Sequence, residues 1–264
     1  MIKNFKRLHE YFVFRQKAII PKSEKIQSAY VAILLKSLFS NDEQLDIFKP
    51  IESERSVFNR SNELMHDLDY GAGSIQKNKR RTLGMIAKIS SASPRKCRFL
   101  YRLVNYIQPS TIIELGTSVG ISVAYMSLAT KLSNIYTIEG NQQRFQQAII
   151  LFNKLNLNNI QAINGLFDDH LPDLLRNSKK LFVYVDGNHT YEATTRYFND
   201  IARVADNDTL IVFDDIRWSS EMKRAWEFII NDKRVQTSID LFTVGIVFFR
   251  KTNEKEHFKI KYLL

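Results

Sequence analysis

From residue 111 onward, short apolar runs alternate with segments of helical periodicity, and this alternation constrains the fold more than any other feature. It is typical of β-α-β units that form a parallel sheet with helices on both faces. Strands are predicted at 111–115, 135–139, 160–163, 181–186, 208–214, 235–241 and 244–250. Helices are predicted between the first six of them, at 119–131, 142–155, 168–177, 190–204 and 219–231.

The last two predicted strands are separated only by Phe242 and Thr243. Such a connection is too short for a parallel crossover, so these strands must pair as an antiparallel hairpin. We therefore predict an α/β fold with a Rossmann-like sheet of seven strands, of which six are parallel and the last is antiparallel.

The first 93 residues have a different pattern and are expected to form a helical extension or lid, with the α/β domain at 94–264. Apolar residues at helical spacing predict a helix over Ser28–Phe39. Another helix is expected to begin at Pro94, because proline suits a first helical turn. Between these two helices lies a turn-rich segment at 69–74. Its residues Tyr70, Gly71 and Gly73 are expected to form a hinge or to contact the cofactor, and the alternative is a simple linker.

The composition narrows the classes of protein that remain. A single cysteine, Cys97, excludes an intramolecular disulfide framework and a multi-cysteine zinc site. The N-terminus lacks the apolar segment of a signal peptide, and no apolar run is long enough to span a bilayer. These features predict a soluble, cytoplasmic protein.

The net charge of +10 is concentrated in the first hundred residues, which hold nineteen Lys or Arg and ten Asp or Glu. No acid occurs between Tyr70 and Ile113, and the basic segment 77–102 falls there. Such a segment can face nucleic acid, phosphates or an anionic membrane. A solvated basic surface is the preferred interpretation, because aromatic residues for base stacking are missing between Lys77 and Lys96.

The first predicted strand ends in Glu114 and runs into a turn with Gly116 and Gly120, and the second strand ends in Glu139. Glycines let the backbone approach a nucleotide, and a carboxylate at the second strand end accepts ribose hydroxyls. The third glycine of a dinucleotide fingerprint is missing, and Glu114 would repel a phosphate. A ligand with a ribose and a cationic amino-acid tail fits better, and S-adenosylmethionine has that shape. The alternative is an ordinary strand-to-helix turn.

Further polar residues follow the later strands, where ligands bind in open α/β sheets. The third strand is followed by Gly165, the fourth ends in Asp186-Gly-Asn-His189, and the fifth ends in Asp214-Asp215. If the fourth and fifth strands are neighbours, Asp186, Asp214 and Asp215 form an oxygen cluster suited to Mg²⁺ or Ca²⁺. Alternatively, Asp215 caps the next helix and Asp186 accepts backbone N–H bonds.

Residues 95–250 resemble the class I S-adenosylmethionine-dependent methyltransferases, in particular O-methyltransferases of the catechol and macrolide-sugar type. The resemblance implies the strand order 3-2-1-4-5-7-6. It implies cofactor contacts from Glu114, Gly116, Thr117, Ser118, Gly120, Glu139, Gly165, Phe167 and Asp186. It also implies a divalent metal such as Mg²⁺ on Asp186, Asp214 and Asp215. Two positions depart from the pattern of the family. Asp215 stands where the catechol type has Asn. Leu166 stands where many relatives have a polar residue that contacts adenine, so the backbone or Asp168 is expected to make this contact.

The expected reaction is transfer of a methyl group to a hydroxyl of a small molecule, which requires positioning and removal of a proton. Candidate catalytic residues are His189, Asp186 and Asp214, with His189 as the expected base and Asp214 or Asp215 as alternative bases. Trp218 and Tyr191 are candidates for the acceptor site. Two alternatives remain: a nucleic-acid methyltransferase that uses the basic segment 77–102, and a non-catalytic nucleotide-binding domain. A homodimer also remains open.

Overall fold

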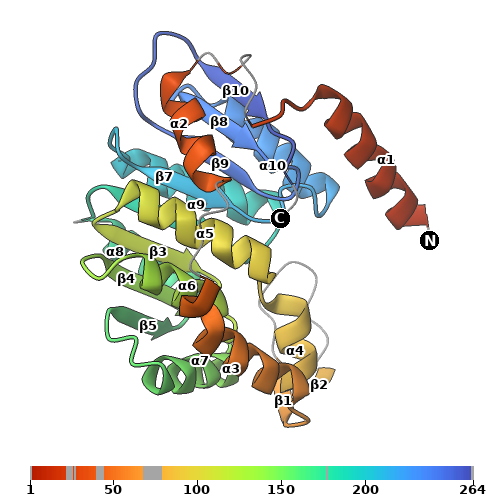
Figure 1. Ribbon diagram of the computed structural model, residues 1–264, viewed down its shortest axis with the longest axis vertical. Coiled ribbons are helices and arrows are strands. Elements are labelled where there is room, and N and C mark those ends of the chain that lie inside the picture. Colours follow the sequence, from red (N-terminus) through yellow and green to blue (C-terminus); the bar gives the residue numbers. More distant parts are fainter. Residues whose placement is uncertain are drawn as a thin grey trace.

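The computed structural model describes residues 2–21, 26, 28–39, 45–67, 79–176 and 178–262, and the main feature of these residues is an eight-stranded mixed sheet (Figure 1). In spatial order its strands are β5 (Ile160–Asn164), β4 (Asn134–Glu139), β3 (Thr111–Leu115), β6 (Leu181–Val185), β7 (Leu210–Phe213), β9 (Gly245–Phe248), β8 (Thr237–Asp240) and β10 (Glu256–Lys259). Only β9 runs antiparallel to its neighbours.

The predicted Rossmann-like α/β fold is confirmed, and the seven predicted strands lie in the predicted order 3-2-1-4-5-7-6. The predicted strand count was too low, because β10 adds an eighth strand that pairs in parallel with β8 at the sheet edge. Its sequence is Glu-His-Phe-Lys, and only Phe258 is buried. A four-residue edge strand with one buried side chain has no apolar run by which it can be recognised.

Helices cover both faces of the sheet, as predicted. One face packs against α5 (Pro94–Ile107), α6 (Ile121–Ala129) and α7 (Gln142–Lys154), and the other against α8 (Phe167–Leu175), α9 (Tyr191–Val204) and α10 (Ser220–Asn231). Side chains alternate between the two cores along each strand. In β6, for example, Phe182 and Tyr184 point toward the α5 side, and Val183 and Val185 toward the α9 side.

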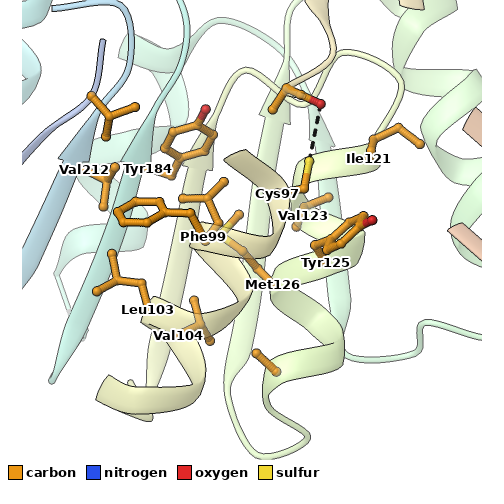
Figure 2. Close-up of a cluster of buried hydrophobic side chains, with 14 of the residues drawn as sticks. Cys97, Phe99, Leu103, Val104, Ile121, Val123, Tyr125, Met126, Tyr184 and Val212 are labelled. Carbon is orange, nitrogen blue, oxygen red and sulfur yellow. Dashed lines mark hydrogen bonds between the residues drawn. The ribbon is translucent and has the colours of Figure 1, made fainter. Parts of the chain in front are cut away.

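Helix α5 is held on the sheet by one apolar face. Its first turn is capped by Ser93, whose Oγ accepts a hydrogen bond from the Lys96 amide at 3.1 Å, and Pro94 occupies the first helical position. Phe99, Leu103 and Val104 then pack against α6 and the sheet (Figure 2). The register of α5 is therefore fixed both by its cap and by its core residues.

The N-terminal segment contributes α1 (Ile2–Lys17), α2 (Ala29–Leu38), the 3₁₀ helix η1 (Leu45–Phe48), α3 (Lys49–Arg60) and α4 (Leu83–Ser90). The predicted helix over Ser28–Phe39 is confirmed, with Ser28 as its N-cap. This segment is not helical throughout, because β1 (Leu64–Asp67) and β2 (Lys79–Thr82) form an antiparallel pair.

Helices α2, α3 and α4 bury side chains in the same core as α5 and α6. The division of the chain at residue 93 stays a prediction. The predicted hinge with Tyr70, Gly71 and Gly73, and Lys77 of the basic segment, lie outside the described residues. No helix in the described part of the chain is both long and apolar enough to cross a membrane.

Candidate active site

The turn after β3 needs glycine at its first position. Gly116 has φ +109°, a conformation that residues with a side chain rarely adopt. A Cβ atom there would overlap the carbonyl oxygen of Asp186 at the end of β6. The amides of Gly116 and Thr117 donate to the Ile138 carbonyl at 3.1 and 3.2 Å. The turn is thereby fixed between the ends of β4 and β6.

The second glycine lets α6 begin close to α7. Gly120 has φ +86°, and a Cβ on it would lie 2.6 Å from the Phe152 ring. Ser118, between the two glycines, also has a positive φ, +49°. Its hydroxyl lies 2.6 Å from that of Ser90 in α4. The turn is thus also in contact with the N-terminal segment.

Glu139, at the end of β4, has its carboxylate held by two backbone amides. Oε2 accepts from the Ser118 amide at 2.7 Å, and Oε1 accepts from the Asn141 amide at 2.9 Å. The structure therefore brings together the predicted turn and the predicted ribose-binding acid. Charge-assisted bonds of this kind orient a carboxylate firmly.

Glu114 lies deeper than the other acids and is fully buried. Its two oxygens accept from the Ser122 hydroxyl at 2.5 Å and the Thr137 hydroxyl at 2.6 Å. Burial raises its pKa from 4.5 to about 8, against the opposing effect of these two hydrogen bonds. The side chain thus connects β3 to β4 and α6 in the core.

The loop after β5 and the loop after β6 meet at one aromatic ring. A Cβ on Gly187 would lie 2.7 Å from the Phe167 ring, and a Cβ on Gly165 would overlap the His170 ring. Leu166 is exposed, and Asp168 forms a bidentate ion pair with Arg196 at 2.7 and 2.9 Å. Phe167 therefore lies beside the Gly187 loop, whereas Asp168 is paired with Arg196.

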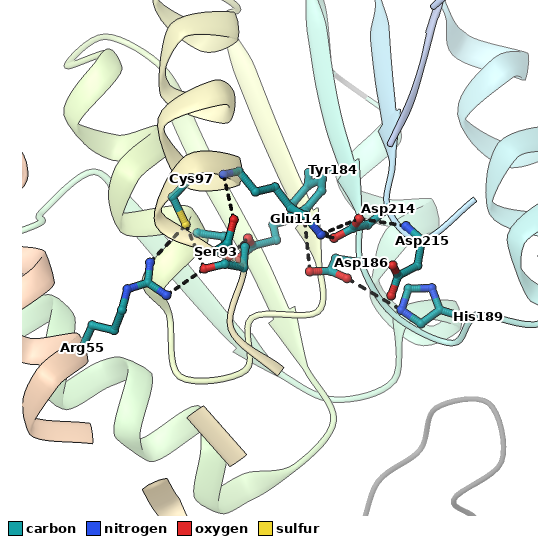
Figure 3. Close-up of polar contacts among 12 residues, drawn as sticks. Arg55, Ser93, Cys97, Glu114, Tyr184, Asp186, His189, Asp214 and Asp215 are labelled. Atoms are coloured by element: carbon teal, nitrogen blue, oxygen red, sulfur yellow. Dashed lines mark hydrogen bonds and ion pairs between the residues drawn. The ribbon is translucent and has the colours of Figure 1, made fainter. Parts of the chain in front are cut away.

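At the ends of β6 and β7, the carboxylates of Asp186 and Asp214 both lie beside the Tyr184 hydroxyl (Figure 3). The Tyr184 hydroxyl lies 3.0 Å from Asp186 Oδ2 and 2.8 Å from Asp214 Oδ2. Lys96 Nζ, from α5, donates to Asp214 Oδ1 at 2.7 Å and Oδ2 at 2.6 Å. The predicted proximity of Asp186 and Asp214 is therefore present, with a lysine ammonium beside them.

The charged groups in this cluster shift one another's pKa values. Burial and the negative charge of Asp214 raise the pKa of Asp186 well above its usual value. Burial acts in the same direction on Asp214, but the Lys96 ammonium overcomes it and lowers the pKa of that carboxyl. Burial would lower the pKa of Lys96, and Asp214 and Asp186 reverse this and raise it. Asp214 and Lys96 thus form a buried ion pair. Of the two carboxyl groups, Asp186 takes up a proton more readily than Asp214.

His189 and Asp215 lie at the edge of this cluster. His189 Nε2 is 3.7 Å from Asp186 Oδ1, and about a fifth of each of these two side chains is exposed, 22% and 17%. Asp215 has φ +51°, and its amide donates to Asp214 Oδ1 at 2.8 Å. The interpretation of Asp215 as a helix cap is wrong, because Ser219 caps α10.

Lys96 and Tyr184 were missed from the sequence, although Lys96 carried a readable signal. Lys96 is followed four and seven residues later by Leu100 and Leu103, so helical periodicity places it on the buried face of α5. It was read only as part of a basic segment. Tyr184 had no such signal, since it lies inside an uninterrupted apolar strand.

Residues 113–216 match a family model described as a methyltransferase domain. A catechol O-methyltransferase of Niastella koreensis is 29% identical over 48% of this chain and 58% of its own length. The O-methyltransferase hkm8 of Aspergillus hancockii is 26% identical over 52% of this chain and 56% of its own length. The chain spans less than two thirds of the length of these curated relatives.

Solved structures show the same fold at low identity. An O-methyltransferase from Bacillus cereus in complex with S-adenosylhomocysteine has a TM-score of 0.56 at 17% identity, covering 83% of this chain and 97% of its own. An S-adenosylhomocysteine-bound methyltransferase from Podospora anserina has a TM-score of 0.60 at 15% identity, covering 89% of this chain and 99% of its own. This chain therefore has the fold of class I methyltransferases, and its residues 113–216 are similar to a methyltransferase domain.

The methyltransferase resemblance carries the expectation of a divalent metal, and the residues present do not fit one. No group of three His, Cys, Asp or Glu among the described residues could hold a metal ion. Both oxygens of Asp214 already face the Lys96 ammonium. Two unit charges 4 Å apart near a protein surface interact with about 4 kcal/mol, so a divalent ion beside that ammonium would meet about twice this repulsion. The predicted metal site on Asp186, Asp214 and Asp215 is therefore not supported.

The residues do fit the cofactor of class I methyltransferases. Gly116 lets the backbone turn lie against the Asp186 carbonyl, and Glu139 is oriented at the neighbouring strand end. Of the predicted acceptor-site aromatics, Trp218 is 59% exposed and lies under the Arg7 guanidinium of α1 at 5.9 Å. Tyr191 instead packs beside Arg224 and Phe228 on α10.

Proposed function

We propose that this methyltransferase-like protein transfers a methyl group from S-adenosylmethionine to a hydroxyl group of a small molecule. The observation that carries the proposal is the contact between the two halves of the site. Gly116 of the cofactor turn lies against the Asp186 carbonyl, so the turn and the acid cluster share one wall. Similarity to proteins named as O-methyltransferases supports an oxygen acceptor.

The cofactor side of the site comprises the turn 116–120 and the ends of β4 and β5. Glu139 would accept the ribose hydroxyls, because its carboxylate is already oriented by the Ser118 and Asn141 amides. Phe167 and Gly165 would flank the adenine ring, as supported by the position of Phe167 beside Gly187 and of Gly165 beside the end of β4. Glu114 accepts hydrogen bonds from the hydroxyls of Ser122 and Thr137, and would stabilise the turn through these contacts.

S-adenosylmethionine supplies the methyl carbon, whose bond to sulfur breaks as its bond to the acceptor oxygen forms, which leaves S-adenosylhomocysteine. The proton of the acceptor hydroxyl must go to a base, and we assign this role to His189. Its Nε2 lies 3.7 Å from Asp186 Oδ1, which supports a role for the Asp186 carboxyl in orienting the imidazole ring. Asp186 therefore acts through His189 as a positioning residue.

The reaction is tested by the release of S-adenosylhomocysteine from the purified protein with a panel of phenols, catechols and sugars, and with RNA as a competitor substrate. Turnover of a hydroxyl compound is expected, and the variant His189→Asn should slow it about 100-fold or more, since general-base catalysis contributes at least that much. Tyr191→Phe, at the first residue of α9, is a matched control. Turnover on RNA alone, or full activity of His189→Asn, would contradict the proposal.

A further inference from the structure

The acid cluster at the ends of β6 and β7 places two carboxylates around one hydroxyl group. Asp186 and Asp214 lie 3.0 and 2.8 Å from the oxygen of Tyr184. A hydroxyl has only one proton, so it can donate a hydrogen bond to only one of the two acids at a time. Carboxylates this close together repel each other, and a neighbouring cation relieves this repulsion.

Lys96 supplies a cation from a part of the chain far from either acid in sequence. Its Nζ lies 2.7 and 2.6 Å from the two oxygens of Asp214, and the two side chains are only 16% and 3% exposed. The two side chains therefore form an ion pair that is largely shielded from solvent. The lysine is part of the site and not of the solvated basic surface.

The ammonium is positioned by a helix and not by a mobile loop. Lys96 lies in the first turn of α5, where its amide donates to the Ser93 cap. Leu100 and Leu103, on the same face of the helix, are completely buried. The packing of α5 on the sheet therefore fixes the place from which Nζ reaches Asp214.

This place is where a divalent cation bound to Asp214 would have to sit. Mg²⁺ binds carboxylate oxygens at about 2.1 Å and demands a near-octahedral set of oxygen ligands. Both Asp214 oxygens already accept hydrogen bonds, Oδ1 from Lys96 and the Asp215 amide, and Oδ2 from Lys96 and Tyr184. The lysine ammonium and a metal ion therefore compete for the same oxygens.

We infer that the Lys96 ammonium serves as the fixed cation of this site in place of a divalent metal ion. It neutralises Asp214 and holds it beside Asp186, while His189 remains available to the acceptor. The part of the inference that concerns methyl transfer rests on the proposed function, whereas the exclusion of metal does not. Two consequences follow. The protein does not bind divalent cations tightly, and loss of the lysine charge increases the affinity of the acid cluster for divalent cations.

The first consequence is tested on the unmodified protein by titration with Mn²⁺, whose electron paramagnetic resonance signal falls when the ion is bound. We expect no saturable binding up to millimolar concentrations. Saturable binding in the micromolar range that is lost in Asp214→Asn would overturn the inference. This measurement requires neither a substrate nor an altered lysine, so it does not depend on whether a variant folds.

The second consequence is tested with Lys96→Met, which keeps the length of the side chain and removes its charge. Its affinity for Mn²⁺ should rise about tenfold or more, in the range by which a group next to a metal changes metal affinity. Arg95→Met, an exposed neighbour on the same helix, is the matched control and should behave like the wild type. Equal Mn²⁺ affinity of Lys96→Met and the wild type, with both proteins folded by circular dichroism, would overturn the inference.

The activity measurement separates this inference from the proposed function. With an accepted hydroxyl compound, a chelator should leave the wild-type rate unchanged, and Mg²⁺ should not increase it. A rate that falls severalfold with chelator and recovers with Mg²⁺ would overturn the lysine inference while supporting methyl transfer. Absence of any turnover would contradict the proposed function and leave the Mn²⁺ result to decide the role of Lys96.

Discussion

Replacement of Glu114 by glutamine should remove a large pH dependence from the stability of the fold. The carboxyl is fully buried between the hydroxyls of Ser122 and Thr137. Glutamine has the same shape, and the Thr137 hydroxyl can reverse its direction, because its contact with Thr117 at 2.6 Å can be donated by either oxygen. The variant Glu114→Gln should therefore fold with little rearrangement.

The size of the effect follows from the pKa of Glu114, about 8 in the fold against 4.5 for an ordinary glutamate. An acid whose pKa is raised binds its proton more tightly in the folded protein, so its contribution is full below pH 4.5 and is lost as the pH rises toward 8. At about 1.4 kcal/mol for each pKa unit, the whole difference of about 3.5 corresponds to about 5 kcal/mol. Between pH 5 and 7.5 the wild type should lose about 3 kcal/mol more than Glu114→Gln.

The assay is urea unfolding followed by circular dichroism at several pH values, with wild type, Glu114→Gln and the exposed control Glu192→Gln. Other titrating groups, including Asp186, are shared by all three proteins and cancel in the differences. The free energy of unfolding of the control should follow that of the wild type. If Glu114→Gln also follows the wild type across this pH range, Glu114 is ionised in the fold and the reasoning is refuted.

Two further substitutions test the turn and the acid cluster. Gly116→Ala should abolish measurable binding of S-adenosylhomocysteine and lower the melting temperature, because the new Cβ meets the Asp186 carbonyl and the φ of this position is +109°. Calorimetry measures the binding and a thermal melt measures the melting temperature. Unchanged binding would contradict this prediction. Tyr184→Phe should cost about 1–3 kcal/mol, since it removes a buried donor from two carboxylates. Urea unfolding measures this cost, and a loss of under about 0.5 kcal/mol, typical of surface positions, would argue against the shared hydrogen bond.

Much of the fold followed from the sequence because the strands that carry it are apolar and regularly spaced. The seven strands between Thr111 and Arg250 were recognisable by this pattern, and the short link at Phe242 and Thr243 identified the antiparallel strand. The edge strand at 256–259 was not recognisable, since only Phe258 of its side chains is buried. Short edge strands are defined by their partner and not by their own sequence.

The parts of the candidate site that follow a common sequence motif could be predicted. The parts that depend on contacts between residues far apart in the sequence could not. Glu139 and the glycine turn were predicted to lie together, and they do. The acids Asp186 and Asp214 were also predicted to lie together, but the identity of their cation was not. Lys96 is more than a hundred residues from Asp214, so only the packing of α5 on the sheet brings the two together.

Calorimetric titration of S-adenosylhomocysteine into the wild type and Glu139→Gln tests the central claim most directly. The account predicts binding at one site in the wild type. It also predicts an affinity at least about tenfold lower in Glu139→Gln, because a hydrogen bond to a charged group contributes about 1.5–3 kcal/mol. No binding to the folded wild type, or equal binding to both proteins, would contradict the claim that the glycine turn and Glu139 form the cofactor site.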